Sequence, residues 1–282
     1  MIYLLLSILS STGIFVIFKL FSKFKVYTLQ AIVINYITAS ICGLLYTQSS
    51  ISIMEIANSN WIIGAACLGV LFISIFNLMA LTAQKNGLSV ASVASKMSMI
   101  IPIIFGIVVF DESVGFQKVI GIILAFLAVY LVSVKHKETN QKGTLLLPLL
   151  LFLGSGIIDT SINFFAPDDD IPLFSAVIFG CAFCIGCLVL LRNYCANNTL
   201  LMPKAIPFGM LLGVVNYGSI YFLLKALRME DLESSDIFTL NNVIIVALSS
   251  LVGLVVFKEV ISKQNWLGIG VAIISIILVT LA

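Results

Sequence analysis

Ten long apolar stretches, separated by short polar connectors, most constrain how this 282-residue chain can fold. Each is close to the roughly 20 residues that a helix needs to cross a lipid bilayer. Because 61% of the residues are hydrophobic and only 10% are charged, no large water-soluble domain fits beside these stretches. The sequence therefore predicts an all-α integral membrane protein with ten transmembrane helices, over about residues 2–21, 27–46, 61–83, 88–110, 117–134, 144–165, 172–191, 205–227, 236–257 and 264–281.

The basic residues predict how these spans are oriented. Eleven of them fall in the odd-numbered connectors or at the span ends beside them, and only three fall in the even-numbered ones. Connectors rich in Lys and Arg tend to stay in the cytoplasm. The count therefore places the odd-numbered connectors inside and both chain termini outside.

A repeat divides the chain into halves of five spans each. Residues 106–125 align without gaps on residues 253–272, at an offset of 147, and nine of the twenty positions are identical. We expect one five-helix unit over residues 1–137 and a second over 143–282. Because five is an odd number, the second unit enters the membrane from the opposite side. Two inverted repeats of this kind are typical of secondary transporters.

The repeated residues resemble the drug/metabolite transporter superfamily, and within it the ten-helix EamA type. Each half contains a Glu after its fourth span, a Gln five residues on, and a Gly four residues further, namely Glu112, Gln117, Gly121 and Glu259, Gln264, Gly268. The resemblance implies a central substrate cavity lined by spans 1, 3, 4, 6, 8 and 9. It also implies cytoplasmic termini, so it disagrees with the count of basic residues. We interpret both glutamates as structural, because they precede the fifth and tenth spans, where carboxylates can bind free N–H groups.

Two ionisable residues lie well inside the spans. At 1.5 Å per residue, Lys96 lies about 12 Å and Asp159 about 22 Å from the cytoplasmic ends of spans 4 and 6. Buried charges in membranes are costly and generally serve a function. Three roles stay open, besides a purely structural pair: a charge pair that gates the pathway, a Lys96 site for an anionic group, and proton exchange at Asp159. The predicted substrate pathway consists of Lys96, Asp159, Asn163, Asn77, Asn216, Tyr217 and Asn242.

Other small or sulfur-containing residues are interpreted as packing elements. Gly209 and Gly213 form a GxxxG spacing on span 8 that permits a close helix crossing. Pro102 is expected to kink span 4. Cys181, Cys184 and Cys187 are spaced like metal ligands, but no His or carboxylate is near enough in sequence to complete a site. We therefore expect no metal and no cofactor.

The function that these patterns favour is secondary transport rather than catalysis. We expect a multi-pass carrier in the plasma (inner) membrane that moves a small polar or amphipathic metabolite by alternating access, export being one option. Its partners would be that substrate and the lipid bilayer, with no nucleic acid, and it would be a monomer or a homodimer. The main alternative is a sodium-coupled ten-helix carrier of the bile-acid symporter type, which needs breaks in spans 4 and 9. An intramembrane enzyme is less favoured, because no catalytic motif is present.

Overall fold

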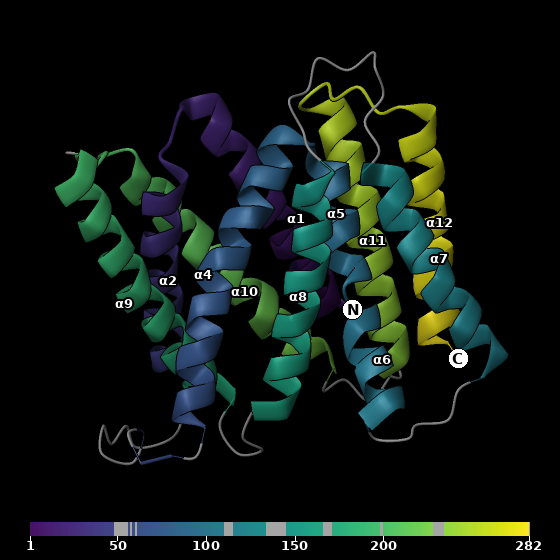
Figure 1. Ribbon diagram of the computed structural model, residues 1–282, viewed down its shortest axis with the longest axis horizontal. Helices are drawn as coiled ribbons and strands as arrows, with labels where there is room; N and C mark the ends of the chain where they lie inside the picture. Colours follow the sequence, from purple (N-terminus) through teal and green to yellow (C-terminus); the bar gives the residue numbers. More distant parts are fainter. Residues whose placement is uncertain are drawn as a thin grey trace.

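Helices account for all the regular secondary structure in the part of the chain that the computed structural model describes (Figure 1). That part comprises residues 1–47, 56, 58–59, 61–109, 115–133, 145–165, 171–197, 200–227 and 234–281. The helices are α1 (Ile2–Phe24), α2 (Thr28–Tyr46), α4 (Ile62–Lys85), α5 (Leu88–Met97), α6 (Ile100–Val109), α7 (Phe116–Ser133), α8 (Leu146–Phe165), α9 (Ile171–Asn197), α10 (Ala205–Leu227), α11 (Ser234–Val255) and α12 (Lys263–Thr280).

The predicted spans agree with these helices to within a few residues, apart from a longer α9. Among the described residues, nine helical segments are long and apolar enough to cross a membrane, with α5 and α6 counted together. A shorter apolar stretch of α8, Leu146–Ile162, corresponds to the remaining predicted span. A helix satisfies its own backbone hydrogen bonds, which lipid cannot do. The chain is therefore a multi-pass helical membrane protein, as the apolar stretches predict.

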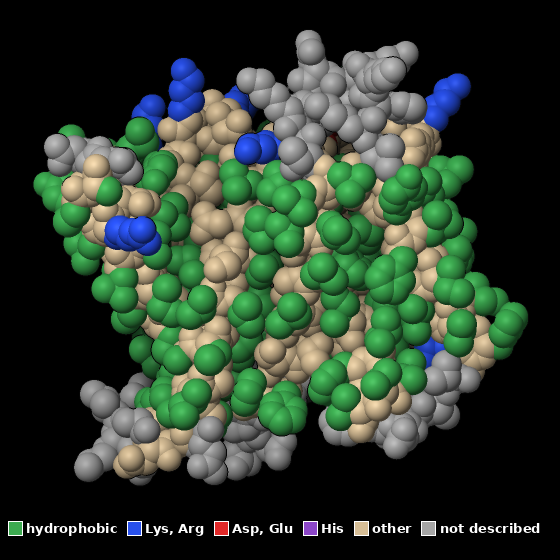
Figure 2. Space-filling model, viewed as in Figure 1, with side chains coloured by type: hydrophobic (Ala, Val, Ile, Leu, Met, Phe, Trp, Pro, Cys, Tyr) green, Lys and Arg blue, Asp and Glu red, His purple; other side chains and the backbone are tan. Residues whose placement is uncertain are grey.

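Large apolar side chains cover the outside of the bundle, where a soluble protein would be polar (Figure 2). Examples are Leu45, Ile63 and Leu267, with exposed fractions of 77%, 76% and 57%. Inside the bundle, aromatic rings pack edge to face, as Phe18 does against Phe76 at 5.6 Å between ring centroids. Because lipid tails solvate Leu and Ile well, the apolar exterior costs no free energy in a membrane.

Helices α7 and α12 pack against each other and form one flank of the molecule, on the right in Figure 1. Their contacts are reciprocal. A Cβ atom on Gly121 would collide with the side chain of Val279, and one on Gly268 would lie 2.8 Å from that of Val132. Val279 is 147 residues after Val132, the same offset that separates Gly268 from Gly121. Each glycine of the repeated signature therefore lets its own helix approach the equivalent valine in the other half.

The GxxxG spacing on α10 forms the close crossing that the sequence predicts. A Cβ atom on Gly209 would lie 2.6 Å from the carbonyl oxygen of Ala31, and one on Gly213 would lie 2.7 Å from that of Asn35. Both oxygens belong to α2, one turn apart. The interpretation of this motif as a helix-packing element is confirmed.

The lysine and arginine side chains visible in Figure 2 gather mainly at the upper end of the molecule, which we call the basic end. Both chain termini lie in the lower half of Figure 1.

If the basic end faces the cytoplasm, a reporter fused after Ala282 lies outside the cell. Alkaline phosphatase, active only outside, should then be active, and green fluorescent protein should stay dark at this position. Fluorescence from the second fusion would instead support the cytoplasmic termini that the family resemblance implies.

Candidate functional site

The fourth span is broken in the middle, between α5 and α6. Residues Ser98 and Met99 form a turn there, closed by a hydrogen bond of 2.9 Å from the Ile101 N–H to the Ser98 carbonyl. Pro102 explains the position of the break, because it has no N–H for the carbonyl four residues earlier and its ring crowds that carbonyl. The expected kink is therefore a two-residue turn, at which Ser98 keeps helical backbone angles. Breaks near the middle of a span are typical of the places where carriers bind their substrates.

Lys96 and Asp159 lie near each other beside this break. Lys96 lies in the last turn of α5, and Asp159 lies on α8, which packs against both α5 and α6. Their charges attract each other, although the two side chains do not form a direct ion pair. The Ser98 hydroxyl lies 3.4 Å from Oδ2 of Asp159 and 2.6 Å from the Ser95 carbonyl, which accepts its stronger hydrogen bond. The arrangement leaves both charged groups with unused hydrogen-bonding capacity.

Both charged side chains can be reached from outside the packed core. Lys96 is half-buried and Asp159 is exposed, so both groups retain surface that a solute can contact. One turn before Asp159 on the same helix face, the buried Ser155 hydroxyl has no hydrogen-bond partner among the described residues. Lys96 and Asp159 together offer a cation and an anion to a small polar molecule, whereas the Ser155 hydroxyl is enclosed by its neighbours.

Asn242 of α11 also reaches the break. Its Nδ2 atom lies 3.6 Å from Sδ of Met99, and the residue is 8% exposed. By the offset of 147, Asn242 is equivalent to Ser95 in the first half, so the two repeats present different polar groups here. The candidate site therefore joins the α5–α6 turn, α8 and α11.

Other residues of the predicted pathway have contacts elsewhere. Asn77 donates to the Ile73 carbonyl of its own helix, α4, at 2.8 Å. Asn216 donates to Oδ1 of Asn35 at 3.2 Å, so it belongs to the α2–α10 interface. Tyr217 stacks on Tyr46 of α2, with 5.9 Å between the ring centroids. The side chain of Asn163 lies outside the described residues.

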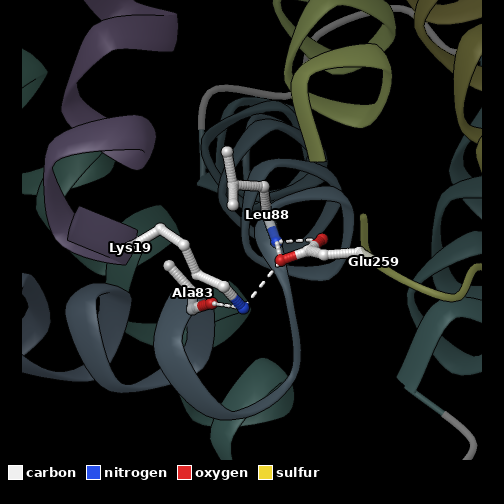
Figure 3. Close-up of polar contacts among 4 residues, drawn as sticks. All are labelled: Lys19, Ala83, Leu88 and Glu259. Atoms are coloured by element: carbon white, nitrogen blue, oxygen red, sulfur yellow. Dashed lines mark hydrogen bonds and ion pairs between the residues drawn. The ribbon is translucent and has the colours of Figure 1, made fainter. Parts of the chain in front are cut away.

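Glu259 of the signature binds the end of a helix, but not the helix that follows it. Its carboxylate accepts the backbone N–H of Leu88, at 3.0 and 3.2 Å, and so caps the start of α5 (Figure 3). The start of α12 is capped instead by Ser262, whose hydroxyl accepts from the Asn265 N–H at 3.1 Å. The expectation that Glu259 serves its own following span is therefore wrong, although the structural role stands. Glu112 lies outside the described residues.

The two signature glutamines differ in their described contacts. Gln117 donates to the Leu278 carbonyl of α12 at 3.2 Å, which adds a polar contact to the α7–α12 flank. Gln264 is half-buried in the first turn of α12. The five described residues of the signature therefore lie at helix ends and helix contacts rather than beside Lys96 and Asp159.

Sequence reasoning missed Ser98, Met99 and Lys19. The first two could have been found from Pro102, because a proline disturbs the turn before it. Lys19 was counted only as an orientation marker, and no sequence pattern links it to Glu259. No cluster of metal-ligating side chains is present in the described ranges.

Comparison with known proteins adds one relative. No model of a known protein family matches the chain. The chain is similar to an uncharacterized protein of Haemophilus influenzae, with 29% identity over 274 residues, which cover 94% of this chain and 93% of that protein. The similarity extends over both halves and over nearly all the predicted spans. It indicates a shared architecture and assigns no activity.

Proposed function

We propose that this protein is a secondary transporter of the plasma (inner) membrane that moves a small polar or amphipathic metabolite by alternating access. The proposal includes membership of the EamA type, on the strength of the twice-repeated Glu, Gln and Gly signature. Two five-helix repeats of opposite orientation would form the scaffold. The Lys96 and Asp159 pair at the break of the fourth span would contact the substrate or its coupling ion.

The reciprocal contacts between α7 and α12 carry this proposal. Let i and j be two residues of the first half, with equivalents i + 147 and j + 147 in the second half. When the halves are related by a twofold axis, a contact between i and j + 147 is accompanied by one between i + 147 and j. Gly121 with Val279 and Gly268 with Val132 fulfil this relation. Two further helix pairings follow it: α2 packs on α10 as α9 packs on α4, and α1 packs on α10 as α8 packs on α4. Such pairings follow from a twofold axis of either direction, and the odd number of spans in each half is what favours an axis in the membrane plane.

The two alternatives receive less support. A carrier of the sodium-coupled bile-acid type needs a second broken helix, whereas α11, the ninth span, is continuous from Ser234 to Val255. An intramembrane Ser–Lys enzyme needs an activated serine near Lys96. The nearby Ser92 hydroxyl donates instead to the Ser89 carbonyl of its own helix, at 3.0 Å.

The test begins with the melting temperature of detergent-solubilised protein in the presence of amino acids, nucleosides, sugars and organic acids. A ligand at about 100 times its Kd stabilises the folded state by about 2.7 kcal/mol, which is a measurable shift. We expect a stabilising compound from this set to cross the membrane of liposomes that contain the protein, with saturable kinetics. A compound that stabilises the protein but is chemically converted, or binds without crossing, would contradict the proposal.

A further inference from the structure

An ion pair joins the two halves at the basic end of the molecule. Nζ of Lys19, near the end of α1, lies 2.7 Å from Oε1 of Glu259, in the connector between α11 and α12. Both side chains are shielded, with exposed fractions of 18% for Lys19 and 5% for Glu259. The Lys19 ammonium group also donates to the Ala83 carbonyl of α4 at 3.3 Å (Figure 3). The pair therefore connects the α11–α12 connector to α1 and α4.

The space around the Glu259 carboxylate is shaped to hold it. A Cβ atom on Gly87 or on Gly253 would lie 2.8 or 2.7 Å from Oε2 of Glu259, so a side chain at either position would displace the carboxylate. Gly87 also has a φ of 107°, which disfavours any other residue. With the Leu88 N–H as a further donor, the carboxylate holds the start of α5 as well. One residue of the second half thus gathers the ends of the first, third and fourth spans.

The repeat offers no equivalent of this ion pair at the opposite end. Glu112 is the counterpart of Glu259, and α8 is the counterpart of α1. The α8 segment, residues 146–165, contains no Lys or Arg that could play the part of Lys19. An ion pair between the first helix of a repeat and this glutamate can therefore stabilise closure at the basic end alone.

Helix packing shows the same asymmetry. Helix α1 packs against both α4 and α5. In the part of the chain that the structure describes, α8 makes no comparable contact with α10 or α11, the counterparts of those helices. The first, third and fourth helices of the first half therefore converge more closely than their equivalents in the second half.

We propose that the Lys19–Glu259 pair is a latch that holds the basic end of the transport pathway closed. In this structure the latch is engaged, and the pathway opens at the basic end only after the pair separates. Breaking it by mutation shifts the resting population towards the state that is open at the basic end. The inference rests on the proposed alternating access, but it concerns conformation and can be tested without a known substrate.

The test measures how fast an impermeant maleimide labels single cysteines in a variant whose six native cysteines are replaced by alanine. Ser89→Cys reports on the basic end, because Ser89 is 4% exposed and follows Leu88 directly. Ser161→Cys reports on the opposite end of α8, where the wild-type residue is half-buried. Each is combined with Lys19→Gln, or with Glu259→Gln, which removes the charge and keeps an acceptor for the Leu88 N–H.

We expect either neutral variant to raise labelling at position 89 at least tenfold and to lower it at position 161. The double variant should have no larger effect than either single one, because both remove the same pair. Lys19→Arg, which keeps the charge, should leave both rates near those of the parent. Lys23→Gln is the matched control, because Lys23 is exposed one turn further along α1 and also carries one positive charge.

Opposite changes at the two positions support the latch. Faster labelling at position 89 with no decrease at 161 would mean that the helix end only frays, and it would overturn the latch. Unchanged rates at both positions would overturn it as well. Neither result bears on the flux measurements in liposomes, so the transport proposal stands or falls separately.

Discussion

Transport is expected to fall more than tenfold when Lys96 is replaced by glutamine or Asp159 by asparagine, because these groups would contact the substrate or the coupling ion beside the α5–α6 break. Initial rates of flux in liposomes, normalised to the amount of folded protein, provide the measurement. Lys85→Gln and Thr160→Val are the controls. Lys85 is an exposed lysine at the end of α4, and the Thr160 hydroxyl donates only to the Gly156 carbonyl of its own helix.

The double variant Lys96→Gln with Asp159→Asn separates a transport role from a structural one. Removing one charge leaves the other without its nearby opposite charge, which destabilises the protein more than removing both charges does. We expect the double variant to regain thermal stability relative to the single variants and to remain inactive. If it regained transport together with stability, the pair would be structural. If Asp159 exchanges protons, Asp159→Asn should also abolish the dependence of any residual flux on the pH gradient.

Thermal stability is expected to fall by several degrees when Gly213 in α10 is replaced by valine, and Gly209→Leu should have a similar effect. The added Cβ atom at position 213 would lie 2.6 Å from Cβ of Thr38 and 2.7 Å from the Asn35 carbonyl oxygen, so the two backbones must separate. Overpacking of this kind typically costs about 1–3 kcal/mol. Separation would also lengthen the hydrogen bond between Asn216 and Asn35. The melting temperature in detergent, followed by size-exclusion chromatography, measures the effect.

Gly270→Val in α12 is the matched control for Gly213→Val. It adds the same side chain to a glycine within a helix, but a Cβ atom there meets no other atom within 4 Å. We expect its melting temperature to stay close to that of the wild type. An equal loss of stability at positions 270 and 213 would mean that helix propensity, and not the α2–α10 contact, explains the result.

The sequence predicted helix positions well, because the length of an apolar stretch and the polarity of its flanks are local properties. It also predicted the close approach at Gly209 and Gly213, since a GxxxG spacing places two small residues on one face of a helix. It did not identify the partner of each polar side chain. Asn216 and Tyr217 are polar residues within an apolar span, as residues of a substrate pathway would be. Only the three-dimensional packing shows that they face Asn35 and Tyr46 of α2.

Glu259 illustrates the same limit for charged residues. Its position before the tenth span predicted a helix-capping role, and the chemistry of that prediction was right. The helix that it caps, α5, is 171 residues away in sequence. No local pattern in the sequence indicates that Glu259 binds the start of α5 or that Lys19 approaches Glu259. The break in the fourth span was predicted in part, because Pro102 indicated a kink but not that α5 would end at Met97.

The α7–α12 flank has a mechanical consequence for the alternating access that we propose. Exchanging the conformations of the two repeats converts the contact of Gly121 with Val279 into that of Gly268 with Val132, and the structure already contains both. Because the exchange leaves this pair of contacts unchanged, the α7–α12 interface would not have to rearrange when a carrier of this kind changes between its outward-open and inward-open states. In the proposed mechanism these contacts would act as a stationary pivot, and the motion would be confined to the remaining helices, including α1, α4 and α5 beside the proposed latch.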